Sequence, residues 1–256
     1  MVTKALAKVE KQPFGLVKVP EYLRGQGQKG LEEVGRDDMI LPRLAIAQSG
    51  SPAFKKASRD RIEGLEEGDL YNTLTRVIYG DKVNLIPVLF FKSFIKFGEK
   101  KDGEAGGIQG IKRSVAAFEQ ATKLGHIKAN ALEFGPDGEK PEWTEFRNFV
   151  CWIPDKKDMV VVSMKSTDTK AAKMWISFMR MAAVPAYGKV YQISTVPVNK
   201  NNYDFFGFEV QPTGEFTPED LFHECDKLYA SLSGKELKID VEGLAAEEVD
   251  AEKAPF

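Results

Sequence analysis

The sequence predicts an α+β protein that is mainly β: a Greek-key barrel with inserted and C-terminal helices. Short segments rich in aromatic and β-branched residues recur along the chain, and clusters of Gly, Pro, Asn and Asp separate them. A few stretches with helical spacing of apolar residues interrupt these segments, and no repeat of fixed period is visible. Short strands joined by turns are typical of an antiparallel barrel, whereas a doubly wound sheet needs strands and helices in regular alternation.

The first half of the chain contains an arm followed by strands. Residues 1–36 are rich in Lys, Gly, Gln and Glu without a steady apolar period, so we expect a flexible N-terminal arm. Extended segments are predicted over 39–48, as a hairpin or extended pair within 70–79, and over 83–97, which carries the strongest strand pattern. The five glycines between residues 98 and 110 predict a flexible loop.

The second half alternates helices with hairpins. Helices are predicted over 111–124, over 171–183 after the capping residues 166–169, and from Thr217 onward, where a proline occupies the first turn. Hairpins are predicted from two pairs of strands, 143–153 with 159–165 and 189–198 with 203–211. We therefore expect one domain over 37–235 and a disordered tail over 236–256.

The nearly neutral charge of the chain hides an asymmetry. The 256 residues include 36 Lys and Arg against 38 Asp and Glu, a net charge of −2. Seven of the acids but only two of the lysines fall within 236–256, which leaves 34 basic and 31 acidic residues in the body. The body is therefore mildly basic and the tail strongly acidic.

Cysteine usage and hydropathy predict a cytoplasmic protein. Cys151 and Cys225 lie far apart and form no disulfide framework, which is typical of a reducing compartment. We find no signal peptide and no apolar run near the length of a membrane span, so neither secretion nor membrane insertion is expected.

Sequence motifs for enzymatic chemistry are absent. The two histidines, His126 and His223, belong to no metal-binding motif, and no phosphate-binding loop or nucleophile elbow occurs. We expect a protein that is not an enzyme, with no cofactor and no metal. A carboxylate cluster assembled from distant residues, as in a metal-dependent nuclease, stays open as an alternative.

The strand over 83–97 carries the main candidate binding residues. Because side chains alternate across a strand, Val83, Leu85, Leu89, Phe91, Ile95 and Phe97 are assigned to a core face. Phe90, Lys92, Phe94 and Lys96 then share the opposite face. Aromatic rings that stack unpaired bases, interleaved with lysines that neutralise phosphates, meet the needs of a single-strand binder. A helix or loop covering this face, with the lysines at its rim, is the competing interpretation.

Further aromatic and basic residues occur in both hairpins and beside the helix over 171–183, where helix N-terminal N–H groups also favour phosphate. The added candidates for nucleic-acid contact are Trp152, Lys165, Lys170, Lys173, Lys189, Tyr191, Lys200 and Tyr203.

The C-terminal residues predict a second interaction element. Carboxylates imitate nucleic-acid phosphates, so an acidic tail can compete with DNA for a basic surface. A terminal Pro-Phe presents a ring and an α-carboxylate to a small apolar pocket rimmed by a cation. The candidate partner-binding residues are Glu247, Glu248, Asp250, Glu252, Pro255 and Phe256. A merely solvating tail is the alternative.

This tail resembles the acidic, Pro-Phe-ended tip of bacterial single-stranded DNA-binding proteins and the Phe-ended tail of their phage counterparts. The stretches 37–44, 68–75 and 84–88 are similar to a set of phage proteins labelled either single-stranded DNA-binding or uncharacterised. The resemblance implies an OB-like barrel that coats single-stranded DNA during replication or recombination, with polymerase, helicase or nuclease partners recruited by the tail. The longer body, Lys253 and the many Glu residues depart from the bacterial pattern.

An interaction protein, such as a DNA-mimicking inhibitor of a host enzyme, is the rival function. A negatively charged body surface and no retention of DNA would favour it. The sequence leaves open whether protomers associate into a homo-oligomer.

Overall fold

The computed structural model describes residues 30, 33, 40–55, 58–98, 107–136, 138–200, 203–241 and 244. For Lys200 and Tyr203 only the backbone is described. The predicted arm over 1–36, apart from two residues, and the tail beyond Leu244 lie outside these ranges.

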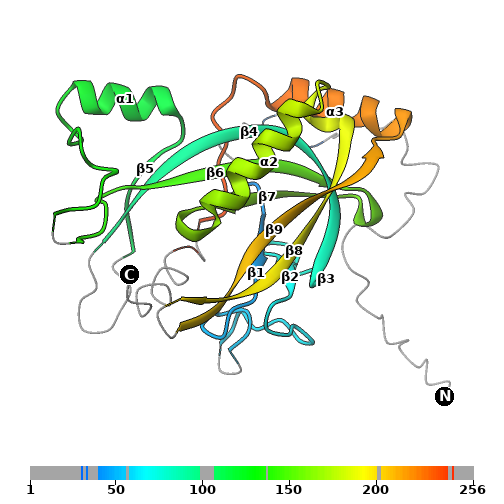
Figure 1. Ribbon diagram of the computed structural model, residues 1–256, viewed down its shortest axis with the longest axis horizontal. Helices are drawn as coiled ribbons and strands as arrows, with labels where there is room; N and C mark the ends of the chain where they lie inside the picture. Colours follow the sequence, from blue (N-terminus) through cyan, green and yellow to red (C-terminus); the bar gives the residue numbers. More distant parts are fainter. Residues whose placement is uncertain are drawn as a thin grey trace, which may run out of the picture.

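Nine strands and three α-helices make up the described part of the chain (Figure 1). The strands are β1 (Arg43–Ile46), β2 (Leu70–Asn72), β3 (Ile78–Gly80), β4 (Lys82–Phe97), β5 (Ile108–Lys112), β6 (Thr144–Ile153), β7 (Asp158–Met164), β8 (Lys189–Lys200) and β9 (Tyr203–Phe216). The helices are α1 (Val115–Lys123), α2 (Thr169–Met181) and α3 (Glu219–Leu232), and a short 3₁₀ turn (Ser166–Asp168) precedes α2. The predicted α+β class is confirmed.

The strands form one curled sheet, a half-barrel, in the order β3-β2-β1-β7-β6-β4-β8-β9, with β5 paired to the end of β4. The β1–β7 pair is parallel and the other neighbours are antiparallel. Strand β4 pairs with β8 through Lys82–Leu85 and with β5 through Phe94–Phe97, both on the edge away from β6. Between these two segments neither β8 nor β5 pairs with β4.

A bulge in β4 reverses the sides on which its residues lie. Pro87 pairs with Cys151 and Leu89 with Val150, so Val88 is an extra residue in β4. One inserted residue shifts the two-residue alternation by one position. Leu85 therefore packs with α2 in the interior of the half-barrel, whereas Leu89 packs in a different cluster on the outer face. The single core face predicted for Val83 to Phe97 is wrong for this reason.

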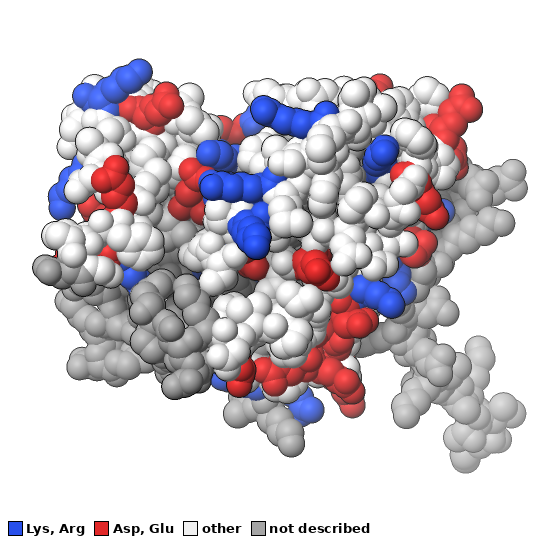
Figure 2. Space-filling model, viewed as in Figure 1, with Lys and Arg blue, Asp and Glu red and all other residues white. Residues whose placement is uncertain are grey.

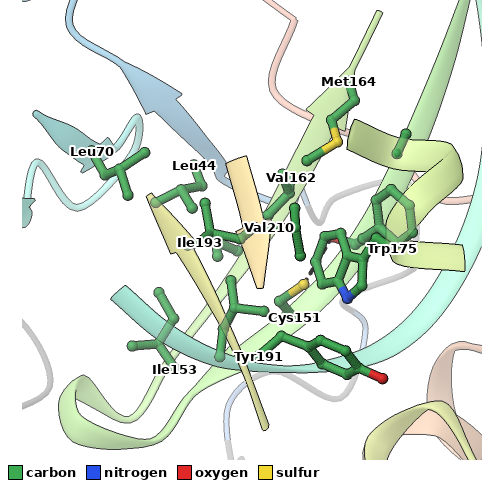
Figure 3. Close-up of a cluster of buried hydrophobic side chains, with 14 of the residues drawn as sticks. Leu44, Leu70, Cys151, Ile153, Val162, Met164, Trp175, Tyr191, Ile193 and Val210 are labelled. Atoms are coloured by element: carbon green, nitrogen blue, oxygen red, sulfur yellow. Dashed lines mark hydrogen bonds between the residues drawn. The ribbon is translucent and has the colours of Figure 1, made fainter. Parts of the chain in front are cut away.

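Helix α2 fills the interior of the half-barrel with Trp175. The indole is fully buried, stacks on Phe149 with ring centroids 4.2 Å apart, and meets the Tyr191 ring edge-on at 6.0 Å. Figure 3 shows it among side chains from both ends of the sheet, with Cys151 and Tyr191 beside it. Burying one large ring against several strands fixes α2 on the concave face of the sheet.

Two polar side chains bind the backbone of β9, one from the segment after β1 and one from the turn before α2. The Gln48 amide donates to the Phe206 carbonyl at 2.7 Å and accepts from the Phe206 N–H at 2.9 Å, as a neighbouring strand would. The Asp168 carboxylate accepts from the Phe208 N–H at 3.0 Å. Gly68, at φ +92°, lets the Phe206 ring approach, because a Cβ there would lie 2.9 Å from it. Part of the β9 edge is thereby satisfied without a further strand.

Helix α1 and β5 form a lobe at one end of β4 (Figure 1). Phe94 stacks on Phe118 at 4.2 Å, and Trp143 meets Phe118 edge-on. The helix predicted from residue 111 begins at Val115, because the Ser114 hydroxyl accepts from the Ala117 N–H as its cap. The loop predicted over 98–110 includes the start of β5. Local composition did not reveal this strand, because it forms by pairing with β4.

The segment after α3 packs against the sheet. Ile239 forms a parallel bridge with Leu41, and the Asp240 carbonyl accepts from the guanidinium of Arg43, which is buried. Leu244 is buried with Ile95 and Phe146. The packed body thus extends past the boundary at 235 that composition suggested.

Replacing Trp175 with Ala is expected to lower the free energy of unfolding by about 3–5 kcal/mol, because it empties the centre of the half-barrel. Urea unfolding followed by far-UV circular dichroism measures the change. Met181→Ala, at a side chain 72% exposed on the same helix, is the control and should change stability by less than about 0.5 kcal/mol. Equal losses for both variants would contradict this account.

Candidate nucleic-acid interface

A strip of the concave sheet face between α1 and α2 carries an open aromatic ring beside charged side chains. Phe90 is 36% exposed and rests on Phe149 with centroids 5.1 Å apart. The bulge at Val88 places Phe90 on this side. Lys92, two residues further along β4, is opposite Arg147 of β6, so the ring and both cations share one face.

The charged residues of the strip are linked to one another and to α2. Glu145 contacts Lys92 Nζ at 3.2 Å through Oε2 and Arg147 through Oε1. Arg147 also donates to the Thr169 hydroxyl at 3.2 Å, in the first turn of α2. The Thr169 contact makes α2 a direct continuation of the strip.

The N-terminal half of α2 lines an open hollow of about 550 Å³. Its lining residues are Ser166, Thr167, Thr169, Lys170, Lys173, Met174, Ser177 and Phe178. Lys170 and Lys173 are exposed, and Figure 2 shows Lys and Arg side chains gathered around this end of α2. Hydroxyls, ammonium groups and the positive end of a helix offer several donors to an anion.

The turn before α2 has an unusual backbone. Ser166 has φ 44°, in the left-handed region that residues other than glycine seldom adopt. Asp168, at the N-cap, makes no side-chain bond to the helix and instead binds the β9 edge. The capping predicted for 166–169 is therefore not made by Asp168, and its carboxylate ties α2 to β9.

Asp168 is held in a mostly buried position, where desolvation raises the pKa of its carboxyl to about 6. The Phe208 N–H and Lys165 act in the opposite direction. A Cβ at Gly207 would lie 3.1 Å from Asp168 Oδ1, so glycine there leaves room for the carboxylate.

Only some of the predicted contact residues come together. Phe90, Lys92, Lys170 and Lys173 lie on the strip or along α2. Phe94 and Tyr191 are 3% and 1% exposed. Phe94 is covered by α1 and Tyr191 lies beside Trp175, so neither ring is open to a base. For Phe94, the competing interpretation of a helix over the face is correct.

The other candidates lie elsewhere. Lys96 pairs with Glu142 at 2.6 Å at the α1 lobe, and Trp152 packs toward α3. The ammonium of Lys165 lies over Phe97 and Phe146, within the outer-face cluster of Ile95, and Lys189 lies over Phe216. The side chains of Lys200 and Tyr203 and the tail residues Glu247, Glu248, Asp250, Glu252, Pro255 and Phe256 lie outside the described residues.

Sequence reasoning did not select Glu145, and it noted Arg147 only as a basic residue of the first hairpin. Their place beside Lys92 follows from the β4–β6 register, which the bulge sets and which local alternation does not reveal. The sequence signal that could have indicated this site was the presence of cationic residues on two strands that pair, β4 and β6.

Metal ligands, reactive thiols and membrane-spanning helices would each indicate another function for the described residues. Among the described residues, no group of three or more His, Cys, Asp or Glu is arranged to hold a metal ion. Burial raises the pKa of the Cys151 and Cys225 thiols, which disfavours the reactive thiolate. None of the helices in the described ranges is long and apolar enough to cross a membrane.

The curled sheet and its cationic helix thus define an α+β protein with a positively charged face that carries an open ring. The chain belongs to the Pam3 phage gp34-like protein family, whose model matches residues 10–238 and so spans the whole sheet and all three helices. No curated protein and no solved structure matches the chain. The family membership supports the bacteriophage assignment that the resemblance implied.

Asp168→Asn is expected to stabilise the protein at pH 7. The folded pKa of about 6 exceeds the ordinary value of 3.8, so the folded state binds more protons between these values and wild-type stability falls as pH rises through them. The free energy of unfolding of the variant should therefore rise relative to that of the wild type between about pH 4 and pH 6. Above that range the variant should be more stable by about 1–3 kcal/mol. Urea unfolding of both proteins across pH measures the difference. A difference independent of pH would contradict the assignment.

Proposed function

We propose that this phage protein binds single-stranded DNA, without turnover, on the strip around Phe90 and the adjoining half of α2. In this role it coats and protects single strands during replication or recombination. In this proposal, the half-barrel has the DNA-binding role that the resemblance implied for an OB-like barrel.

The observation that carries the proposal is the open Phe90 ring on one face with Lys92 and Arg147. This face adjoins the half of α2 that carries Lys170 and Lys173, through the contact of Arg147 with Thr169. Among the described residues, the ion pairs made by this set are those of Lys92 and Arg147 with Glu145, so four cations stand against one carboxylate. Unpaired bases stack on aromatic rings, and lysine and arginine neutralise the phosphates between them. A duplex hides its base faces, so this combination favours single strands.

The acidic C-terminal residues add a proposed second role. Leu244 is anchored in the body, so the chain beyond it starts from a defined point on the outer face of the sheet. We propose that residues 245–256 recruit replication or recombination proteins, such as a polymerase, helicase or nuclease, through their carboxylates and Phe256.

Fluorescence titration with oligo(dT) and with a matching duplex across a salt series tests the main proposal. We expect tighter binding of oligo(dT) and a linear fall of log K with log salt concentration, whose slope reports the number of phosphates contacted. If neither nucleic acid is retained at low salt, DNA coating is wrong and the rival function as an interaction protein gains support.

Phe90→Ala is expected to weaken oligo(dT) binding by about 1–3 kcal/mol, because it removes the stacking ring without removing charge. Phe134→Ala is the matched control, since this ring is 60% exposed but lies outside the strip. Both affinities are measured by fluorescence titration at one salt concentration. Equal affinities for wild type and Phe90→Ala would exclude Phe90 from the interface.

Deleting residues 246–256 should raise DNA affinity at low salt and abolish capture of the phage or host replication proteins. The first effect follows from removing carboxylates that repel DNA or compete with it. Titration of oligo(dT) and affinity capture with the full-length and shortened chains measure the two effects. Unchanged affinity together with retained partners would contradict the role of the tail.

A further inference from the structure

The Glu145 carboxylate lies between two cations on the surface proposed to bind DNA. One oxygen contacts Lys92 Nζ at 3.2 Å and the other contacts Arg147. The three side chains are partly exposed, at 33% for Lys92, 22% for Glu145 and 15% for Arg147. The group therefore lies at the surface through Lys92 and part of Glu145, whereas the Glu145 oxygen that faces Arg147 is buried until the carboxylate moves.

The surroundings of this carboxylate suit a phosphodiester. Arg147 is held by both Glu145 and the Thr169 hydroxyl, so its guanidinium is fixed in place. Lys92 is two residues from Phe90 on the same face, a spacing of about 7 Å along the strand. A base stacked on the Phe90 ring would thus bring the adjoining backbone phosphate to Lys92 and Arg147.

We propose that one backbone phosphate of the bound strand takes the position between Lys92 and Arg147, and that Glu145 occupies this position in the free protein. This inference rests on the proposed function and adds a regulator to it. The carboxylate holds both cations in place for the phosphate and must be displaced when the strand binds. Glu145 therefore weakens binding and makes it selective for ligands that compete for both cations.

Displacement has a consequence for salt dependence. In the wild type, the charge gained by the phosphate contacts is partly offset by the Glu145 charge that is left unpaired. Without this charge, binding neutralises about one further phosphate, so the slope of log K against log salt concentration steepens by about 0.7 for a single strand.

Glu145→Gln is the variant that tests the proposal, and Glu142→Gln is its matched control. Glu142 also pairs with a lysine of β4, Lys96, and with Lys128, but it belongs to the α1 lobe. Both variants remove one negative charge, so a general effect of net charge would appear in both. Glu145→Asp retains the charge and should bind like the wild type.

Titration with labelled oligo(dT) across salt is expected to show roughly five- to tenfold tighter binding by Glu145→Gln at low salt, with the steeper slope. Glu142→Gln should change affinity less than about twofold, because water screens charges outside the contact. The double variant Lys92→Gln, Glu145→Gln should lose most of the gain, since one of the two cations released by Glu145→Gln is then missing.

If the wild type binds oligo(dT) and Glu145→Gln binds equally or more weakly, the phosphate site is wrong while the proposed function stands. Equal gains for Glu142→Gln and Glu145→Gln would also overturn it. If no variant and no wild-type protein binds oligo(dT), the proposed function itself fails. Binding of oligo(dT) by Glu145→Gln but not by the wild type would support competition between Glu145 and the phosphate for the two cations.

Discussion

The seating of Trp175 in the half-barrel is the interaction on which the arrangement of the molecule depends. Its ring stacks on Phe149 of β6, meets Tyr191 of β8 edge-on and belongs to one buried cluster with residues of β1, β2, β7 and β9. The sheet is curled and only partly closed, so it needs a large apolar group to fill its concave side. By filling that space, α2 is held at a fixed position, with Thr169 within hydrogen-bonding distance of Arg147.

The surface that we propose for DNA binding depends on the position of α2. Helix α1 covers Phe94 at one end of β4 and α2 covers Phe149, which leaves Phe90, Lys92, Glu145 and Arg147 between them. The bulge at Val88 decides that Phe90 lies on this side and not among the clusters under α3. A stable core and an open aromatic ring thus come from neighbouring residues of one strand.

Polar side chains replace strand neighbours where the sheet ends. Gln48 makes two hydrogen bonds with the Phe206 backbone, and Asp168 accepts one from Phe208. The position that lets Asp168 make this hydrogen bond is mostly buried, and the desolvation raises the pKa of its carboxyl. The contact couples the β9 edge to the turn that lines the α2 hollow, so the same residue supports both the sheet and the candidate interface.

Local sequence determined the α+β class, most strands, the two hairpins and the helix that carries Trp175, because periodicity and turn residues act over a few positions. It also predicted Phe90, Lys92, Lys170 and Lys173 as contact residues, and the structure places these four on the strip or along α2. The opposite fates of Phe90 and Phe94 could not be derived from it, because alternation gives both the same face and only packing against α1 separates them. The roles of Glu145, Arg147 and Asp168 were decided by tertiary structure, since strand register and burial arise from contacts between residues far apart in the chain.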